Sequence, residues 1–82
     1  MFFVYFLRCC DNSLYCGYTN DLKKRIETHN AGKGAKYTKK KLPVYLEYSE
    51  EFLDKSSAMK REYVLKQLTK REKEELIRLD KI

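Results

Sequence analysis

The N-terminal segment constrains the fold of this chain most strongly. Residues 2–7, Phe-Phe-Val-Tyr-Phe-Leu, are apolar or aromatic throughout, a pattern typical of a strand that is buried on both faces. Turn-forming residues follow at 11–13, and Leu14–Thr19 returns as a second strand. We therefore expect a hairpin. The pattern leaves open whether Tyr5 and Tyr15 share a face, because a shift of one residue in the pairing exchanges the faces.

A helix and a third strand are expected next. Asn20 or Asp21 is a suitable N-cap for a helix from Leu22 to about Asn30, and Gly32 and Gly34 end it. Residues 33–41 contain five lysines and are expected to form a loop or a single helical turn. Residues 44–48, after the proline, alternate as a strand.

The C-terminal third is expected to be helical. One helix starts at Asp54 or Ser56 and runs to about Leu68. Residues 69–72, Thr-Lys-Arg-Glu, match the S/T-x-x-E capping box of a last helix that ends near Leu79. The order is strand, strand, helix, strand, helix, helix, without a linker or repeat. We expect one domain, residues 1–82, of the α/β (α+β) class, with a three-stranded, mostly antiparallel sheet flanked by helices.

Charge and cysteines limit the function classes. The chain has 18 Lys and Arg against 12 Asp and Glu, a net charge of +6, which favours polyanions as partners, although many small basic proteins bind none. Cys9, Cys10 and Cys16 are odd in number and form no C-x-x-C pair. They support neither a disulfide framework nor a zinc site and predict buried, reduced thiols in a cytoplasmic protein. Residues 2–7 are too few to span a bilayer and lack a signal-peptide layout, so we expect no export and no membrane partner.

Two polar residues of the first helix lie toward its apolar side. Successive helical residues turn by about 100°, so positions four apart differ by only about 40°. Leu22 and Ile26 mark the buried side, and Arg25 and His29 flank it. Each alone fits an arginine whose stem packs on the core, or a histidine at the core edge. Together they indicate a site.

Glu62 has a similar position on the next long helix. The apolar stripe of that helix consists of Ala58, Met59, Val64, Leu65 and Leu68. Glu62 falls at the margin of this stripe. Its carboxylate either pairs with a neighbour such as Arg61 or Lys66 or faces a shared cleft, and periodicity leaves both open.

The lysine-rich segment after the first helix has the chemistry of a phosphate-binding loop. Glycines allow the backbone to approach a ligand closely, and ammonium groups neutralise phosphates regardless of base sequence. A solvated loop is the alternative. The two hydroxyl side chains within the segment favour contact, because both can donate to phosphate oxygens. The candidate nucleic-acid-binding residues are Lys33, Lys36, Tyr37, Thr38, Lys39, Lys40 and Lys41.

These residues form an ordered motif. Residues 3–5 are Phe-Val-Tyr, and residues 15–29 match Y-x-G-x-T-x-x-L-x-x-R-x-x-x-H, with Glu62 following the third strand. The set resembles the GIY-YIG nuclease domain, found in the N-terminal part of the UvrC repair protein and in homing and restriction endonucleases. It is most similar to the small single-domain bacterial members of the YhbQ and YazA type, including residues 30–38, and the similarity covers essentially the whole chain.

The resemblance implies a nuclease that hydrolyses phosphodiester bonds in DNA, or in RNA, with low sequence specificity. Tyr5 and Tyr15 would be catalytic, one of them helping to deprotonate the attacking water. Arg25 would neutralise charge on the scissile phosphate, and His29 would hydrogen-bond to a tyrosine or to the water. Glu62 would hold a single divalent metal, Mg²⁺ or Mn²⁺. The implied partner is nucleic acid, with DNA favoured, and no small-molecule cofactor is implied.

Two other functions remain open. A nucleic-acid-binding module with weak or lost activity is favoured by Phe3 in place of the first motif glycine. It is also favoured by the last helix, which lacks the asparagine that many members have after the metal-binding glutamate. The second motif has Cys16 at its centre, which is a small apolar substitution. A protein-interaction domain without a nucleic-acid role is the third hypothesis.

Overall fold

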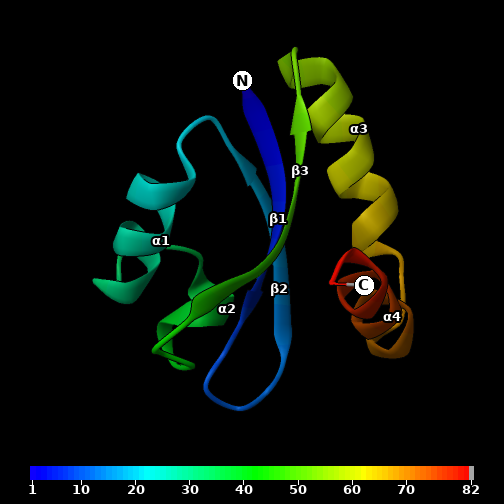
Figure 1. Ribbon diagram of the computed structural model, residues 1–82. Helices are drawn as coiled ribbons and strands as arrows, with labels where there is room; N and C mark the ends of the chain where they lie inside the picture. Colours follow the sequence, from blue (N-terminus) through cyan, green and yellow to red (C-terminus); the bar gives the residue numbers. More distant parts are fainter. Residues whose placement is uncertain (82) are drawn as a thin grey trace.

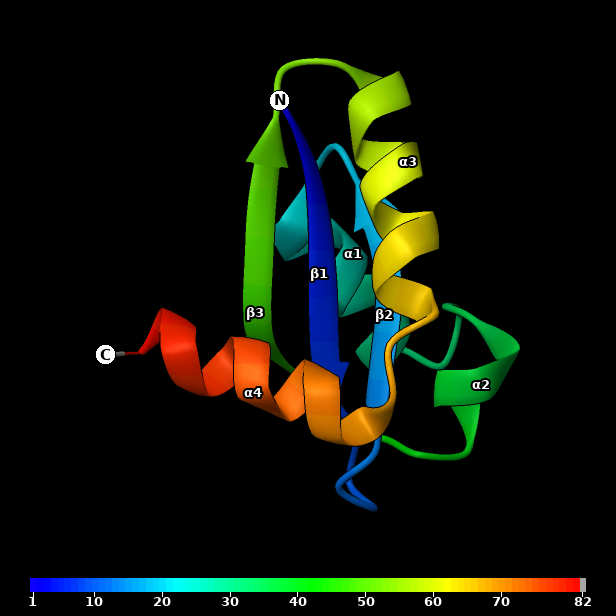
Figure 2. The same cartoon turned by 90° about the vertical axis from the view of Figure 1, so that its right-hand side faces the viewer.

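The computed structural model describes residues 1–81. Its strands are β1 (Phe2–Arg8), β2 (Leu14–Thr19) and β3 (Tyr45–Phe52), and its helices are α1 (Leu22–Asn30), α2 (Lys36–Lys39), α3 (Lys55–Lys66) and α4 (Lys70–Asp80). The strands form one antiparallel sheet in the order β2-β1-β3. Helices α1 and α2 cover one face of the sheet, and α3 and α4 cover the other (Figures 1 and 2). The predicted fold class and element order are confirmed, with α2 as the single turn in the lysine-rich segment.

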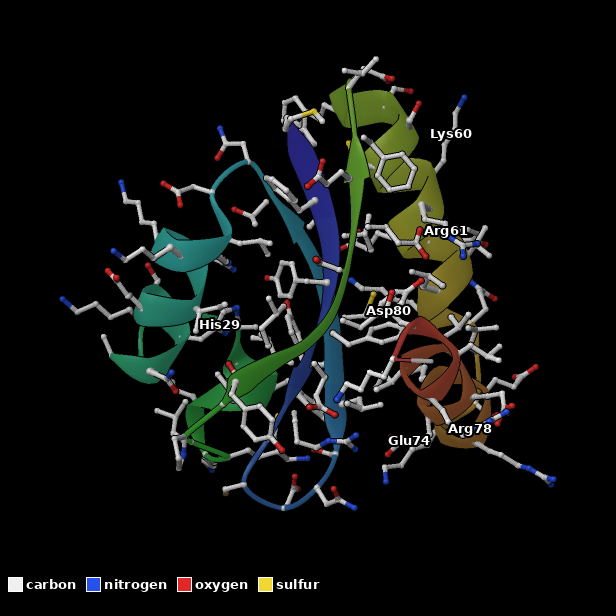
Figure 3. All side chains as sticks on the ribbon, viewed as in Figure 1. His29, Lys60, Arg61, Glu74, Arg78 and Asp80 are labelled. Atoms are coloured by element: carbon white, nitrogen blue, oxygen red, sulfur yellow. The ribbon has the colours of Figure 1, made fainter. Side chains whose placement is uncertain are left out.

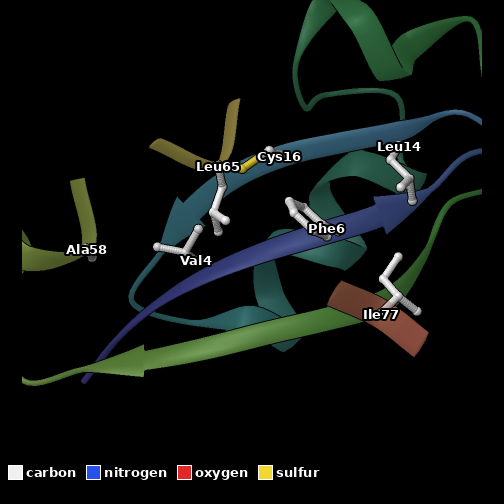
Figure 4. Close-up of a cluster of buried hydrophobic side chains, with 7 residues drawn as sticks. All are labelled: Val4, Phe6, Leu14, Cys16, Ala58, Leu65 and Ile77. Carbon is white, nitrogen blue, oxygen red and sulfur yellow. The ribbon is translucent and has the colours of Figure 1, made fainter. Parts of the chain in front are cut away.

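The central position of β1 explains its composition. A strand between two neighbours and two helical layers has no wet face, and Val4–Leu7 are accordingly buried. One apolar cluster lies between the sheet and the α3–α4 layer (Figure 4) and consists of Val4, Phe6, Leu14, Cys16, Ala58, Leu65 and Ile77. The other faces the α1–α2 layer and is built from Tyr5, Leu7, Cys9 and Val44, with Tyr15, Leu22, Ile26 and Leu42 packed against it. The candidate tyrosines belong to this second face.

Side-chain caps fix where the long helices begin. Asp21 accepts a hydrogen bond from the backbone N–H of Lys24 at 3.1 Å and caps α1. Asp54 does the same for α3 through Ser57, at 2.8 Å. Thr69 and Glu72 form the predicted reciprocal capping box at α4. A cap satisfies backbone donors that no helical carbonyl reaches. The starts of these three helices can therefore be predicted from the sequence.

Three details differ from the predictions. Strand β3 continues to Phe52 rather than ending at Tyr48, because polar residues 49–51 still pair with β1 along a partly exposed edge strand. Met59 and Val64 are exposed rather than part of the core. Cys9 and Cys16 are buried free thiols as expected, whereas Cys10 is exposed in the β1–β2 turn. Within residues 1–81, none of the helices has the length and apolar character needed to cross a membrane.

Candidate active site

The pairing of β1 with β2 decides which face the two tyrosines occupy. Tyr5 lies opposite Gly17, and Leu7 lies opposite Tyr15. Residues two apart on a strand share a face with each other and with their cross-strand partners, so both tyrosines point toward the α1–α2 layer. Their ring centroids are 6.4 Å apart, with the planes inclined by 45°. Tyr5 is buried and Tyr15 is half-buried.

The position of Tyr5 depends on Gly17. A Cβ atom at residue 17 would lie 2.6 Å from the Tyr5 hydroxyl oxygen and 3.1 Å from the ring of Tyr15. Both distances are below ordinary van der Waals contact. The motif glycine therefore supplies the space in which the Tyr5 hydroxyl lies across the strand pair.

His29 on α1 completes a polar cluster beneath the helix. Its ring is fully buried between α1 and the sheet (Figure 3). The Nε2 atom lies 3.3 Å from the Tyr5 hydroxyl oxygen, and the ring centroid lies 5.2 Å from that of Tyr15. Burial, and then the positive charge of Arg25, lower the pKa of His29. The imidazole is therefore neutral near neutral pH.

Arg25 brings a fixed positive charge to the tyrosines. Hydrogen bonding with Tyr5 is the main effect that raises the pKa of Arg25. Burial raises the pKa of Tyr5, and the hydrogen bond with Arg25 opposes that rise without cancelling it. Arg25 is half-buried and lines two shallow hollows, of about 210 and 440 Å³, that share Thr19 and Asn20. The guanidinium thus joins the buried phenol to an open, polar surface.

The loop after α1 closes over His29. A Cβ atom at Gly34 would lie 2.2 Å from His29 Nδ1, so only glycine permits this approach. The Thr38 hydroxyl oxygen lies 2.8 Å from the same Nδ1 atom and donates to the carbonyl oxygen of Ala35 at 3.0 Å. Thr38 is fully buried. This placement differs from the prediction that Thr38 donates to phosphate, because its hydroxyl already has two partners inside the protein.

The other residues of the lysine-rich segment face outward. Tyr37 is exposed, and its ring is stacked on Tyr15 at a centroid distance of 6.0 Å. The Lys41 ammonium lies 3.9 Å from the Tyr37 ring centroid and pairs with Asp11 at 3.2 Å. The remaining members of the predicted set are exposed, namely Lys33, Lys36, Lys39 and Lys40. They are accessible to a polyanion, whereas the charge of Lys41 is partly balanced within the protein.

Glu62 comes from the opposite layer. Its side chain on α3 is 17% exposed, and its carboxylate pairs with Lys66 Nζ at 3.5 Å, which is one of the two outcomes that periodicity left open. Helix α3 packs against β2, and the negative charge of Glu62, after the larger effect of burial, raises the pKa of Cys16 on that strand to about 11. The structure brings Tyr5, Tyr15, Arg25 and His29 together, and records no contact between Glu62 and these four among residues 1–81.

The donor set near Glu62 limits the kind of metal it could bind. Residues 1–81 contain no group of three or more His, Cys, Asp or Glu side chains arranged to hold an ion. A single carboxylate fits Mg²⁺, which keeps several waters and takes few protein ligands. It does not fit Zn²⁺, which is held by three or four protein side chains.

Comparison with known proteins identifies the family. A family model described as the GIY-YIG catalytic domain matches residues 1–75. The chain belongs to the GIY-YIG family. A UPF0213 protein of Bacillus velezensis is 59% identical over 75 residues, which are 92% of this chain and 76% of that protein. The UPF0213 protein YazA of Bacillus subtilis is 57% identical over 72 residues, 88% of this chain and 73% of that protein.

Solved structures agree with the GIY-YIG assignment. The solution NMR structure of a UPF0213 protein of Bacillus halodurans matches with a TM-score of 0.62 and 46% identity, and covers 96% of this chain and 85% of that one. A solution NMR structure of a protein from E. faecalis also matches with a TM-score of 0.62, at 39% identity over 94% of this chain and 82% of that one. The resemblance inferred from the sequence is confirmed.

One functional signal of this GIY-YIG domain is not visible in the motifs. Residues 20–41, which span α1, α2 and their loops, contain eight of the 18 basic residues and two of the 12 acidic residues. This segment therefore carries the whole net charge of +6, and the rest of the chain, with ten residues of each sign, is neutral. The layer that covers the tyrosines is the electropositive one.

Proposed function

We propose that this GIY-YIG domain is a divalent-metal-dependent nuclease that hydrolyses phosphodiester bonds in DNA or RNA with low sequence specificity. The observation that carries the proposal is the cluster of two tyrosines, a histidine and an arginine beneath the electropositive layer. Family membership supports a nuclease-like function in general. The metal requirement, the choice of DNA or RNA, a role in DNA repair and a cytoplasmic location belong to the proposal.

Phosphodiester hydrolysis sets two demands. Water attacks an anion poorly, so a catalyst must offset negative charge and must remove a proton from the water. Arg25 meets the first demand, because its guanidinium lines an open hollow and can bind two phosphate oxygens in parallel. The tyrosines and His29 meet the second, since they lie close together beside that guanidinium.

The exposed lysines of the α1–α2 layer supply the binding energy. Phosphate contacts depend on charge and not on base identity, which accounts for low sequence specificity. Glu62 would hold the Mg²⁺ or Mn²⁺ ion, which when bound would offset phosphate charge and lower the pKa of a coordinated water. Lys66, which pairs with Glu62, would have to release the carboxylate for the ion.

A nicking assay tests the proposal. Supercoiled, branched and single-stranded substrates are incubated with Mg²⁺ or Mn²⁺ and with wild type, Arg25→Ala or Glu62→Gln. We expect wild type to cut, and each variant to lose about 100-fold or more in rate. Glu75→Gln is the matched control, because Glu75 is an exposed carboxylate on α4 whose one ion pair within residues 1–81 is with Arg78.

Two results would reject the nuclease. Equal cutting by wild type and Glu62→Gln would show that a contaminating enzyme cuts. Salt-sensitive binding by wild type and Glu62→Gln, without turnover with either metal, would instead support the binding module whose chemistry is lost.

A further inference from the structure

Both ring nitrogens of His29 have partners, and the partners come from different layers. Nε2 lies 3.3 Å from the Tyr5 hydroxyl oxygen on β1, and Nδ1 lies 2.8 Å from the Thr38 hydroxyl oxygen on α2. The Thr38 hydroxyl continues to the carbonyl oxygen of Ala35, at 3.0 Å. Tyr5, His29 and Thr38 are each exposed by 1% or less. In the free protein, solvent is therefore largely excluded from these hydrogen bonds.

The direction of each hydrogen bond follows from counting protons. A carbonyl oxygen only accepts, so the single Thr38 hydroxyl proton goes to Ala35, and the Thr38 oxygen accepts from Nδ1–H of His29. A neutral imidazole has one N–H, which leaves a lone pair on Nε2. The Tyr5 hydroxyl must then donate to Nε2.

The opposite arrangement fails at Tyr5. If Thr38 donated to Nδ1, then Nε2–H would donate to the Tyr5 oxygen. The Tyr5 hydroxyl proton would then have no acceptor among the hydrogen bonds of residues 1–81, although Tyr5 is buried. A buried donor without an acceptor is unfavourable.

We propose that Thr38 is a positioning residue, which holds His29 in its Nδ1–H form so that Nε2 accepts the hydroxyl proton of Tyr5. Gly34 allows the arrangement, because a side chain at that position would overlap the His29 ring. The assignment of the tautomer stands on these hydrogen bonds, and its catalytic consequence rests on the proposed function.

The consequence is a proton relay that selects Tyr5 over Tyr15 as the base. As the water oxygen forms its bond to phosphorus, the Tyr5 oxygen takes a proton from that water, and the Tyr5 hydroxyl proton passes to Nε2 of His29. The bond from phosphorus to the leaving oxygen breaks, and the leaving oxygen keeps the electron pair and takes a proton from solvent. His29 becomes an imidazolium, and because its ring is buried, its Nε2 proton returns to the Tyr5 oxygen as Tyr5 releases a proton to solvent. No free phenolate forms, which matters because burial raises the pKa of Tyr5.

The groups around His29 suit an acceptor. Tyr5 faces the ring from β1, Tyr15 from β2, Arg25 from the same helix and Thr38 from α2. The only full charge among these four groups is that of Arg25, and burial, followed by this charge, lowers the pKa of His29 and keeps the resting imidazole neutral. The ring can therefore accept a proton when the substrate phosphate brings negative charge to Arg25.

Nitrogen NMR tests the tautomer directly, because the chain contains one histidine. In protein labelled with nitrogen-15 histidine, we expect a pyrrole-type shift for Nδ1 and a pyridine-type shift for Nε2. Thr38→Val, which keeps the shape but removes the acceptor, should move Nε2 toward the pyrrole-type position. Thr38→Ser should keep the wild-type pattern, and so should Tyr5→Phe. A pyrrole-type Nε2 in wild type, or an unchanged pattern in Thr38→Val, would overturn the proposal, and amide spectra confirm that each variant is folded.

Measurements of the cleavage rate distinguish failure of the Thr38 proposal from failure of the proposed nuclease function. With the substrate and metal that wild type cuts, Thr38→Val should lower kcat about 10–100-fold with little change in KM, and Thr38→Ser should recover most of the loss. If the tautomer changes in Thr38→Val and kcat does not, the relay is wrong. If wild type cuts no substrate, the proposed function fails, while the NMR result still decides the role of Thr38.

Discussion

At the scale of single residues, the site depends on space as much as on chemistry. Gly17→Ala would place a Cβ atom 2.6 Å from the hydroxyl oxygen of Tyr5. Because Tyr5 is buried and cannot turn away, we expect a loss of about 1–3 kcal/mol in the free energy of unfolding. We also expect a shift of the His29 Nε2 resonance, since the Tyr5–His29 hydrogen bond must lengthen. Urea denaturation and nitrogen NMR measure the two effects.

Gly32→Ala is the control for that substitution. Gly32 has a φ of +76° and no atom within 4 Å of an added Cβ. Alanine there costs about 1–2 kcal/mol through backbone strain alone. We therefore expect a similar loss of stability with an unchanged His29 resonance. Equal resonance shifts in both variants would mean that Gly17 does not act through Tyr5.

The lowered pKa of His29 gives stability a pH dependence of known sign. Burial is the larger cause of the shift, and Arg25 is the second. Between the folded pKa and the unfolded value of about 6.5, the unfolded chain binds more protons. The contribution is therefore complete above the unfolded pKa and is lost as the pH falls through the folded one. We expect the free energy of unfolding to decrease as the pH falls below the unfolded pKa of about 6.5, with a smaller slope in His29→Gln. Parallel slopes would contradict the prediction.

At the scale of elements, one buried arginine fastens α4 to the sheet. Arg8 at the end of β1 donates to Glu47 on β3 at 2.9 Å and to Glu74 on α4 at 2.6 Å. The Arg8 side chain is 11% exposed, so it needs these acceptors. The hydrogen bond with Arg8 is the main effect that lowers the pKa of Glu74, to about 2. The docking of α4 is therefore partly electrostatic.

Glu74→Gln tests this attachment. We expect a loss of about 1–2 kcal/mol in the free energy of unfolding, because Arg8 keeps Glu47 but loses the second charge. In wild type the contribution of Glu74 should disappear as the pH falls from about 4.5 to about 2, and the variant should lack that part of the acid transition. Glu75→Gln, next along the helix at an exposed ion pair, should leave the denaturation midpoint unchanged. Equal midpoints for both variants would contradict the role of Arg8.

Elements with local signals were predictable, and those set by distant partners were not. Asp21, Asp54 and Thr69 cap the starts of helices through hydrogen bonds within four residues, so the sequence alone locates these helix starts. The register of the hairpin could not be predicted, because β1 is apolar on both faces. The observed register pairs Tyr5 with Gly17, and it fits the packing of side chains across the two strands, because a Cβ atom at residue 17 would overlap Tyr5. The end of β3 was missed for a similar reason, since Glu50 is held by Arg61 of α3.

At the scale of the whole molecule, some residues of the candidate site could be predicted from the sequence, and the positions of others depend on how distant segments pack. Arg25 and His29 were predicted from helix periodicity and the two tyrosines from the resemblance to the GIY-YIG family, and the four lie together. Thr38 was assigned to phosphate binding. Nothing in its sequence neighbourhood shows that the loop folds back and brings Thr38 against His29, nine residues earlier in the chain. Glu62 belongs to α3, which covers the opposite face of the sheet from α1, the helix that carries His29 (Figure 1). A single catalytic site that uses both residues would therefore have to extend around an edge of the sheet, whose outer strands are β2 and β3.

The division of charge between the layers can be tested with two double variants that have the same net charge as each other. Replacing Lys39 and Lys40 by alanine lowers the charge of the α2 segment by two, and replacing Lys60 and Arg71 does the same on the α3–α4 side. All four side chains are exposed, and Lys60 points away from the sheet (Figure 3). If the α1–α2 layer is the nucleic-acid face, only the first double variant removes lysines that neutralise phosphates.

We expect the Lys39→Ala, Lys40→Ala variant to bind duplex DNA more weakly, with a salt dependence that is shallower by about 0.9 for each phosphate that is no longer neutralised. The Lys60→Ala, Arg71→Ala variant should retain a salt dependence of binding close to that of wild type. Both variants weaken the long-range attraction equally, and this attraction is screened beyond about 10 Å at 0.1 M salt. Titrations at several salt concentrations measure both slopes. An equal weakening of binding in both variants would show that net charge alone governs binding, and a larger weakening in the second variant would place the nucleic acid on α3 and α4, the layer that carries Glu62.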